Sequence, residues 1–247
     1  MRVLILTVTL LSTAFAVPLY KQKLKDTISL INNLQGDDAL RDSFLEGLIR
    51  DLIEEFRDMM IAGTDTIPVL DPFNLDQLTI DDIPSPGARV ILNDVVVDHL
   101  STFVINDLSV STVSLILQRY AIEVDLTIPE LDAKVGNYDL LINAMGFNVF
   151  GNGKANVKVV NPRVIATITA GLRISISGIS VNLIDCKIKF SLDGFEPDIT
   201  GLFNDDPSSS FVSAVLRHLV PDLVKVYEDD INDFLSELVF DILNDLL

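Results

Sequence analysis

The middle of the chain alternates apolar and polar side chains with a period of two, which is typical of β-strands that bury one face. In the clearest stretch, residues 122–128, four aliphatic side chains alternate with acidic and hydroxylated ones. The same alternation returns in residues 184–193. These patterns predict antiparallel strands with one apolar face, and such a face needs something apolar to cover it.

Turn residues divide this region into strands. Pro129 and the pair Gly136 and Asn137 are expected to mark turns, and residues 151–153 (Gly-Asn-Gly) predict a hairpin. Breaks are also expected near Gly171 and Gly178. Strands are predicted at residues 78–80, 95–97, 102–117, 147–150, 155–160 and 163–192. The first of these lies in a loop-rich link, residues 68–86, that contains four prolines.

Both ends of the chain change to a helical period. Residues 20–62 predict two helices that end at Gly36 and Gly63, because glycine favours the left-handed C-cap position. After Pro207, apolar residues recur every three or four positions, which predicts a helical segment roughly 55 Å long. Pro221 is expected to kink this segment or to start a second helix. The predicted fold class is therefore α+β, with amphipathic terminal helices covering an antiparallel sheet.

The last helix carries a row of acidic residues opposite its apolar stripe. They recur at every fourth position, as Asp229, Asp233, Glu237, Asp241 and Asp245. Like charges at this spacing repel by a few tenths of a kcal/mol per pair, so the stability of the helix did not require them. Two interpretations are open. The row is a solvated face that keeps the protein soluble, or it is a surface for a basic protein partner.

The first sixteen residues have the features of a secretory signal. Arg2 precedes an apolar run over residues 3–11, and Ala14 and Ala16 form a cleavage site of the A-x-A type. We therefore predict a signal peptide at residues 1–16 and a secreted, extracellular mature chain at residues 17–247. No later stretch is long and apolar enough to span a bilayer, so stable membrane insertion is not expected.

Charge and cysteine content narrow the possible partners of the protein and the possible sources of its stability. The chain has 36 acidic and 18 basic residues, a net charge of −18, which disfavours nucleic acid and anionic membranes as partners. Cys186 is the only cysteine, so stability must come from packing in a single domain rather than from disulfides. Cys186 falls among the apolar positions of its strand and is interpreted as a small buried hydrophobe. The alternative is an exposed thiol that links two chains.

Catalytic chemistry has little support in the sequence. His99 and His218 stand outside any motif with a nucleophile, and the G-x-S-x-G motif of esterases is absent. Residues 151–154 lack the spacing of a phosphate-binding loop. Four acidic residues lack the pattern of a calcium loop and are interpreted as solvated loop residues: Asp71, Asp76, Asp81 and Asp82. We expect no catalytic residues, no metal site and no cofactor.

Several segments occur in an order that is known from one family. Residues 67–73 read IPVLDPF, residues 124–131 read VDLTIPEL and are followed by GNY at 136–138, and GNG and GLFN stand at 151–153 and 201–204. In this succession the chain resembles the insect takeout and juvenile hormone binding protein family, within the TULIP class of tubular lipid-binding proteins. The resemblance extends over most of the mature chain.

The resemblance implies a strongly curved antiparallel sheet that wraps around a long C-terminal helix and encloses a tunnel for an elongated apolar ligand. The chain departs from the family in two features. It lacks the cysteine pair that the family usually carries near the mature N-terminus, and His99-Leu100-Ser101 stands where members commonly have Gly-Leu-Ser. The fold is expected to be kept, whereas specificity for juvenile hormone does not follow.

These observations together predict a secreted, non-enzymatic carrier of a terpenoid or a fatty acyl chain. The alternative is a secreted interaction protein with a fully packed core and an acidic helical face. The candidate ligand-binding residues are apolar or aromatic side chains on the predicted strands, the link and the long helix. They are Phe73, Leu126, Ile128, Tyr138, Leu140, Phe147, Ile176, Phe190, Phe211, Val215 and Leu219.

Overall fold

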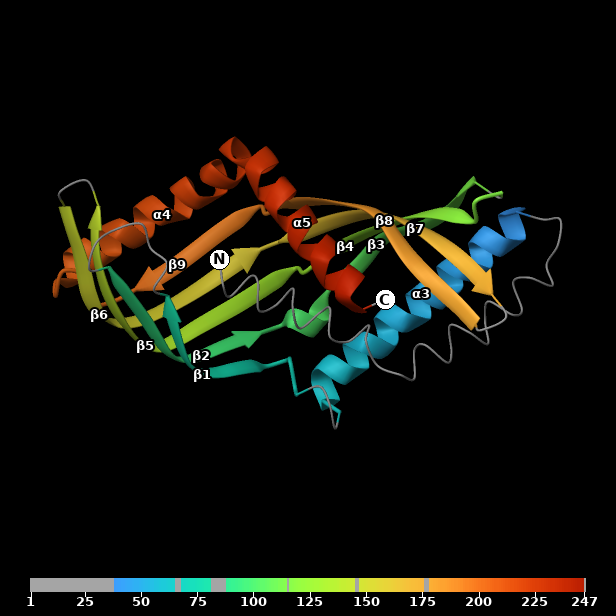
Figure 1. Cartoon of the computed structure of the whole chain (residues 1–247). Coiled ribbons are helices and arrows are strands. Elements are labelled where there is room, and N and C mark those ends of the chain that lie inside the picture. Colours follow the sequence, from blue (N-terminus) through green and yellow to red (C-terminus); the bar gives the residue numbers. More distant parts are fainter. Residues whose placement is uncertain are drawn as a thin grey trace.

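The computed structural model describes residues 38–64, 68–80, 88–114, 116–144, 147–175 and 178–246, and these residues form an α+β fold (Figure 1). The strands are β1 (Phe73–Ile80), β2 (Arg89–Asp98), β3 (Val104–Ser114), β4 (Arg119–Thr127), β5 (Glu130–Ala144), β6 (Phe147–Val160), β7 (Arg163–Ser175), β8 (Gly178–Ser191) and β9 (Gly194–Ile199). The helices are α3 (Asp38–Ala62), α4 (Asp206–Val226) and α5 (Glu228–Leu246), with a short 3-10 helix η1 (Leu100–Thr102). The predicted fold class is confirmed.

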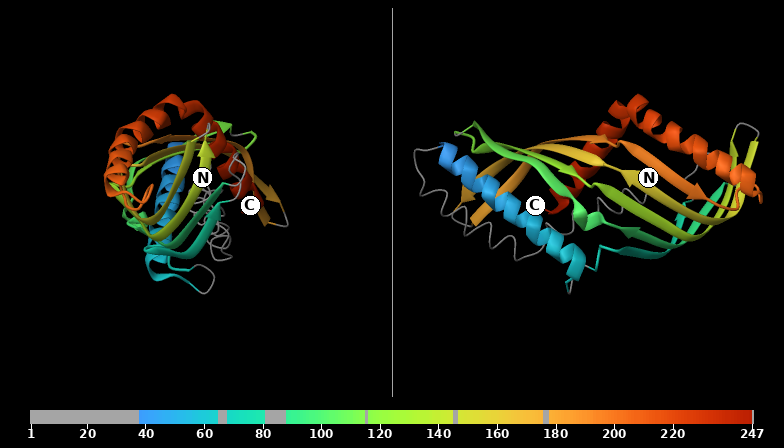
Figure 2. Two further views of the ribbon diagram at one scale, coloured as in Figure 1. Left: turned by 90° about the vertical axis from the view of Figure 1, so that its left-hand side faces the viewer. Right: turned by 180° about the vertical axis from the view of Figure 1, so that it is seen from behind.

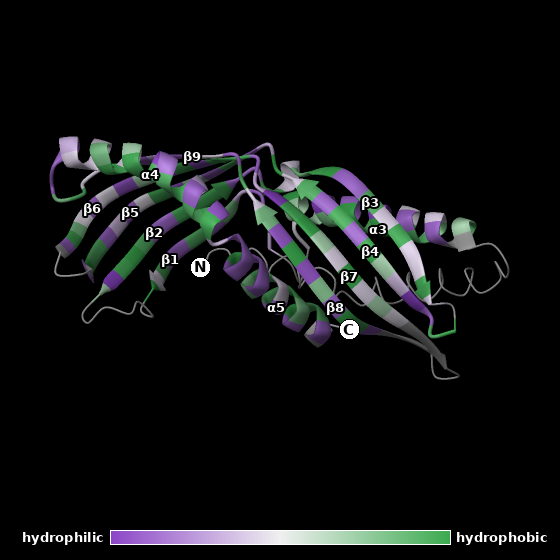
Figure 3. Cartoon of the chain, turned by 90° about the horizontal axis from the view of Figure 1, so that it is seen from above, coloured by the Kyte–Doolittle hydropathy of each residue, from purple (hydrophilic) through white to green (hydrophobic). Residues whose placement is uncertain are grey.

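The strands form two antiparallel sheets, ordered β1-β2-β5-β6-β9 and β3-β4-β7-β8. The chain passes between the sheets four times, and these short connections lie where the sheets meet (Figure 3). We call them the waist, which comprises residues 99–103, 128–129, 161–162 and 192–193. Each pair of strands that is joined there is one path bending from one sheet into the other. The predicted curved sheet is thus present as two sheets with a bend between them.

Backbone hydrogen bonds hold neighbouring connections of the waist together. The amide of Ile128 donates to the carbonyl of Pro162 at 3.0 Å, and the amide of Asn161 donates to the carbonyl of Pro129 at 3.1 Å. Because proline has no N–H group, these two prolines take part only as acceptors. Asn161 has a positive φ of 47°, which turns the chain sharply between β6 and β7. The bend is therefore fixed by the backbone itself.

Each helix lies along an edge strand and accepts hydrogen bonds from its free N–H groups. From β8, Ile188 and Phe190 donate to Ser236 and Asn232 of α5, both at 2.8 Å. The strand residues are two apart and the helix residues four apart. These spacings correspond to about 6.6 Å along a strand and about 6 Å along a helix, so the two repeats nearly match.

The other two helices repeat this arrangement. On β3, Val110 and Thr112 donate backbone N–H groups to the carboxylates of Glu46 and Asp42 in α3, at 3.0 and 3.3 Å. On β9, Ile199 donates to the hydroxyl oxygen of Ser213 in α4 at 3.1 Å. Three of the four edge strands, β3, β8 and β9, are therefore covered by α3, α5 and α4.

The main apolar core lies beside the waist, where α3 meets both sheets. Its buried members come from the helix, the following loop, β1, β2 and the first connection: Ile53, Phe56, Met60, Leu70, Phe73, Val95, Val97 and Phe103. The helix ends as predicted at Gly63, which has a φ of 69° and donates its N–H to the carbonyl of Met59 at 2.8 Å. A second cluster joins Cys186 and Ile188 of β8 to Leu235 of α5.

Two predictions of turns at glycines are wrong, because these glycines lie within strands. Gly151 and Gly153 do not form a hairpin, because β6 runs through them without a break. A Cβ atom on Gly153 would lie 2.0 Å from the carbonyl oxygen of Thr200, so the glycines allow residues 200–202 to approach the strand. Gly136 likewise marks no turn. It lies within β5, beside a shift in register between Val135 and Tyr138.

The predicted breaks in the strands and helices are partly wrong. β1 extends over residues 73–80 in the supposed loop, and Gly171 lies inside β7, whereas the predicted break before Gly178 is present. Pro221 lies within α4, and the helical segment instead breaks at Tyr227.

On α5, the predicted acidic positions Asp229, Asp233, Glu237 and Asp241 are exposed. Residues 1–37, with the predicted signal peptide and first helix, lie outside the described residues, as do the side chains of Asp81, Asp82 and Asp245.

Two acidic residues assigned to solvent by the sequence pattern have structural contacts. Asp125 of β4 is buried and receives two hydrogen bonds from the guanidinium of Arg163, at 2.8 and 2.5 Å, and one from Asn106 at 3.0 Å. The hydrogen bond from Arg163 lowers the pKa of Asp125, and this outweighs burial, which raises it. Asp71 accepts hydrogen bonds from the backbone of His99 and Ser101.

We predict that Arg163→Met destabilises the protein by about 1–3 kcal/mol at pH 7, because it leaves the buried carboxylate of Asp125 with fewer donors. The lowered pKa means that this stabilisation is present above the ordinary aspartate pKa of about 3.9 and is lost as pH falls through the lower, folded-state value. Urea unfolding measured from pH 7 to pH 3 should show the difference from the unsubstituted protein shrinking in acid.

The control for this substitution is Arg119→Met, because Arg119 is an exposed residue at the start of β4. It should change the free energy of unfolding by no more than about 0.5 kcal/mol. Equal losses for the two variants would mean that the Arg163–Asp125 pair has no special effect.

We also predict that Asn232→Ala destabilises the protein by about 1–2 kcal/mol, because the N–H of Phe190 loses its acceptor on α5. The matched control is Asn244→Ala, an exposed position on the same helix, which carries the same change in helix propensity. Thermal melts should separate the two variants by roughly 2–8 °C. Coincident melts would show that the bond from the edge strand contributes nothing.

Candidate functional site

Among the described residues, many apolar side chains of the sheets are only partly buried. Figure 2 shows the curvature of the strands and the position of α4 along one rim, and Figure 3 shows hydrophobic residues alternating with hydrophilic ones along the strands. Several apolar side chains around the main core remain half-buried. They include Leu75, Leu92, Val124, Leu126, Ile128, Leu131 and Val135. This half-covered apolar wall is the first candidate surface for a hydrophobic ligand.

The predicted ligand-binding residues fall in separate places. Phe73, Leu126 and Ile128 come together in the main core beside α3, where Phe73 is buried and the other two are half-buried. Phe190 packs instead with the α5 cluster. Leu140 is a half-buried residue of β5. The side chain of Phe147 and the whole of Ile176 lie outside the described residues.

Tyr138 has a structural contact at the position where a ligand contact was predicted. Its side chain is buried in β5, and its hydroxyl donates a hydrogen bond to the carbonyl of Thr200 at 2.7 Å. Burial raises the pKa of this hydroxyl, so it remains protonated and able to donate. Tyr138 thereby holds the segment before α4 against the five-stranded sheet.

The remaining predicted residues lie on α4, whose opposite face is anchored. The hydroxyl oxygens of Ser209 and Ser213 are buried and accept hydrogen bonds from the backbone of Leu202 and Ile199. The N-cap residue Asp205 accepts a bond from the amide of Ser208 at 3.0 Å, as is common at the start of a helix. These contacts fix the orientation of α4 about its axis.

The free face of α4 carries a row of exposed apolar side chains at a spacing of four. We call this row the α4 stripe; it consists of Phe211, Val215, Leu219 and Leu223, which are between 41% and 69% exposed. A shallow depression of about 440 Å³ lies along it, lined by Ala214, Val215, His218, Leu219 and Asp222. A more polar depression of about 300 Å³ adjoins it and shares His218 and Asp222.

The sequence prediction identified three of the four residues of the stripe and missed Leu223. The same helical spacing that selects Phe211, Val215 and Leu219 also selects Leu223, so the signal was available. The polar residues of the depressions, His218 and Asp222, were missed because nothing in the sequence shows which face of a helix remains free.

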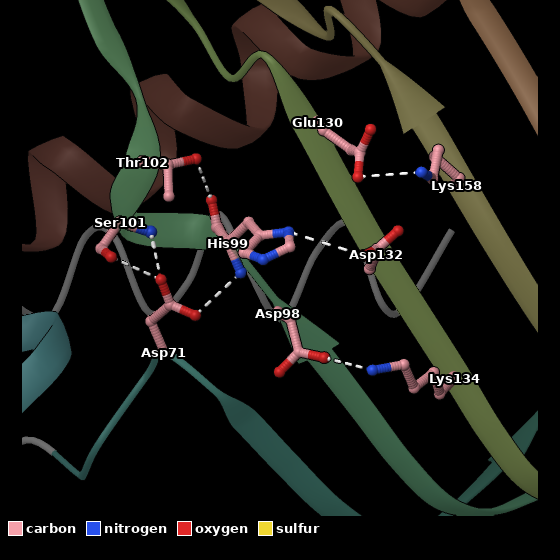
Figure 4. A network of polar contacts seen from close by, with 9 residues as sticks. All are labelled: Asp71, Asp98, His99, Ser101, Thr102, Glu130, Asp132, Lys134 and Lys158. Atoms are coloured by element: carbon pink, nitrogen blue, oxygen red, sulfur yellow. Dashed lines mark hydrogen bonds and ion pairs between the residues drawn. The ribbon is translucent and has the colours of Figure 1, made fainter.

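A separate polar cluster lies at the waist (Figure 4). It contains His99 from the first connection and Glu130 and Asp132 from the start of β5. One possible ligand atom from each of the three residues lies within 4.8 Å of the others, so they form a set that could hold a metal ion. No metal site was predicted from the sequence, because His99 is about 30 residues away from Glu130 and Asp132 and only the fold brings the three together.

Comparison with known proteins identifies the family. The model of the haemolymph juvenile hormone binding protein (JHBP) family matches residues 10–247. The chain belongs to this family. The resemblance to the takeout and juvenile hormone binding proteins is therefore confirmed.

One solved structure agrees with the fold of this JHBP-family chain. The crystal structure of Takeout 1 from Epiphyas postvittana aligns with 79% of this chain and 90% of its own, with 18% sequence identity and a TM-score of 0.52. At that identity the likeness shows the fold alone. A lipopolysaccharide binding protein aligns with 70% of this chain and 32% of its own, with 12% identity and a TM-score of 0.32. A search of curated proteins gave no match.

Among the described residues, no helix of the JHBP-family chain combines the length and apolar character needed to cross a membrane. Its cysteine, Cys186, is 5% exposed and packs between β8 and α5, which confirms its interpretation as a buried hydrophobe. Burial raises the pKa of the Cys186 thiol to about 11. The thiol is therefore both shielded and protonated at neutral pH.

We predict that the Cys186 thiol of the folded protein reacts only slowly with a disulfide reagent such as Ellman's reagent at pH 8, and that it reacts fully in urea. Both the burial of the sulfur and its raised pKa reduce attack by the thiolate. The absorbance of the released thiolate measures the rate. Rapid labelling of native protein, or a predominant disulfide-linked dimer on non-reducing gels, would contradict the buried position.

Proposed function

We propose that the protein is a secreted, non-enzymatic carrier that binds an elongated hydrophobic molecule, such as a juvenile-hormone-like terpenoid or a fatty acyl chain. The observation that carries this proposal is the combination of a half-covered apolar wall and the exposed α4 stripe in one fold. Membership of the JHBP family supports the same class of ligand. The predicted signal peptide at residues 1–16 supports secretion.

Transfer of an elongated apolar ligand out of water can supply much of the binding energy. Burying about ten methylene groups at roughly 0.8 kcal/mol each yields about 8 kcal/mol before the cost of association is subtracted. That amount alone does not exceed micromolar affinity, so shape and one or two polar contacts must add to it. On the α4 side, His218 and Asp222 border the apolar depression and are placed to make such contacts.

The proposed ligand-binding residues on α4 are Phe211, Val215 and Leu219, joined by Leu223. Those on the strands are Leu126, Ile128 and Leu140, whose side chains are half-buried. Phe73, Tyr138 and Phe190 belong to packed parts of the structure, so we propose that they have structural roles and do not contact the ligand.

A second candidate function is binding of a basic protein partner through the acidic face of α5. It is favoured by the exposure of Asp229, Asp233, Glu237 and Asp241 on one side of that helix. Electrostatic binding of this kind would weaken steeply with added salt, whereas uptake of a neutral apolar ligand would not. Salt dependence therefore separates the two functions.

We predict that the mature protein binds fluorescent fatty acid or terpenoid analogues saturably and that Leu219→Gln weakens this binding by about five- to thirty-fold. The change removes apolar contact worth roughly 1–2 kcal/mol, and the side chain is exposed, so folding should be preserved. Binding isotherms and thermal melts should be measured on the same samples.

The matched control for the binding experiment is Leu117→Gln, which changes a similarly exposed leucine in the β3–β4 turn, away from α4. It should bind the probe as the unsubstituted protein does. If Leu219→Gln also binds normally, the α4 stripe is not part of the site. If the unsubstituted protein takes up no long apolar probe, the carrier function itself is wrong.

A further inference from the structure

The first connection of the waist and the start of β5 bring a histidine and two carboxylates to one point. His99 directly follows β2, and Glu130 and Asp132 lie two apart on the neighbouring strand β5, so they project from the same face. Their meeting point is fixed by strand register, which sets Asp98 opposite Asp132. The Nδ1 atom of His99 lies 3.6 Å from Oδ2 of Asp132 (Figure 4).

The backbone of His99 is held on both sides. His99 has a left-handed backbone conformation, with a φ of 73°, which residues other than glycine rarely adopt. Its N–H donates to Oδ1 of Asp71 at 2.9 Å, and its carbonyl accepts the hydroxyl of Thr102 at 2.8 Å. The other carboxylate oxygen of Asp71 accepts the N–H of Ser101 at 2.8 Å. The imidazole is therefore presented toward Asp132 from a fixed backbone, and its side chain is 46% exposed to solvent.

We propose that His99, Glu130 and Asp132 form a site for a divalent transition-metal ion, with Zn²⁺ as the best fit. One imidazole nitrogen and two carboxylate oxygens are common zinc ligands, and a water molecule can take the fourth position. The imidazole favours zinc over calcium and magnesium, which prefer an all-oxygen set. Zinc bonds of about 2.1 Å place tetrahedral ligand atoms roughly 3.4 Å apart, so atoms now within 4.8 Å need move only by about 1 Å.

Lys158 of β6 is the competitor of the metal ion. Its amine lies 2.9 Å from Oε1 of Glu130, in a pair whose side chains are 40% and 45% exposed. Exposed pairs of this kind contribute only about 0–1 kcal/mol, so an ion that binds all three ligands can displace the lysine. Lys134 is a nearby lysine of the same charge, but it pairs with Asp98, which is not a ligand of the site.

Zinc bound here would connect the segment that leads from β2 to β3 with the first residues of β5. Both segments belong to or adjoin the waist, so the ion would link two of the four paths between the sheets. Because the three ligands meet only in the folded chain, binding must also stabilise the fold by mass action.

The test is isothermal titration of the mature full chain with ZnCl₂ in a buffer that does not coordinate zinc. We expect one strong site per chain, much weaker binding of Ca²⁺ and Mg²⁺, and a rise in melting temperature with zinc. His99→Ala should abolish the strong site and the shift in melting temperature. The matched control is His218→Ala, because the chain has only these two histidines, and it should bind as before.

Two lysine variants distinguish specific coordination of zinc at this site from nonspecific electrostatic attraction of cations to an acidic protein. Lys158→Ala should tighten zinc binding several-fold, because it frees Glu130, whereas Lys134→Ala should change it far less. Equal tightening in both variants, zinc binding that survives His99→Ala, or no binding by the unsubstituted chain would each overturn the proposal. None of these readouts depends on the uptake of a lipid.

Discussion

The structure depends on hydrogen bonds that run from edge strands to the side chains of helices. Backbone N–H groups of β3, β8 and β9 find acceptors on α3, α5 and α4, such as Glu46, Asn232 and Ser213. Each of these helices therefore runs along one edge of a sheet, and α3 and α5 also pack apolar side chains against the strands. On α4, Ser209 and Ser213 fix the face that is anchored, and this leaves the α4 stripe exposed on the other face.

The waist is held in a different way, by short-range hydrogen bonds between neighbouring connections. Carbonyl groups of Pro129 and Pro162 accept hydrogen bonds from the neighbouring connection, and left-handed residues at Asn161 and His99 turn the chain. The apolar core around α3 lies directly beside it. The molecule therefore combines a hydrogen-bonded, packed centre with sheets that extend away from it on both sides.

The local pattern of the sequence predicts which elements form but not which residues meet. Alternation correctly predicted a strand at residues 95–97, where Val95 and Val97 are buried, and the glycine rule correctly ended α3 at Gly63. The hairpin predicted at residues 151–153 is absent, since the need for glycine at Gly153 comes from Thr200, far away in the sequence. Asp125 stands at a polar position of its strand pattern, and that pattern does not show that its partner is Arg163 on another strand. The polar cluster of His99, Glu130 and Asp132 depends on strand register, which no local pattern encodes.

The helix α5, which covers the edge strand β8, also affects whether copies of the chain associate with one another. An edge strand with free N–H and carbonyl groups is a template for pairing with a strand of another molecule. Ser236 and Asn232 occupy this template on β8, and the acidic side of α5 faces outward beyond them. The C-terminal helix thus protects the edge strand β8 from pairing between molecules. A chain that ended before α5 would expose this edge and would be prone to aggregate through β-strand pairing, as amyloid-forming segments do.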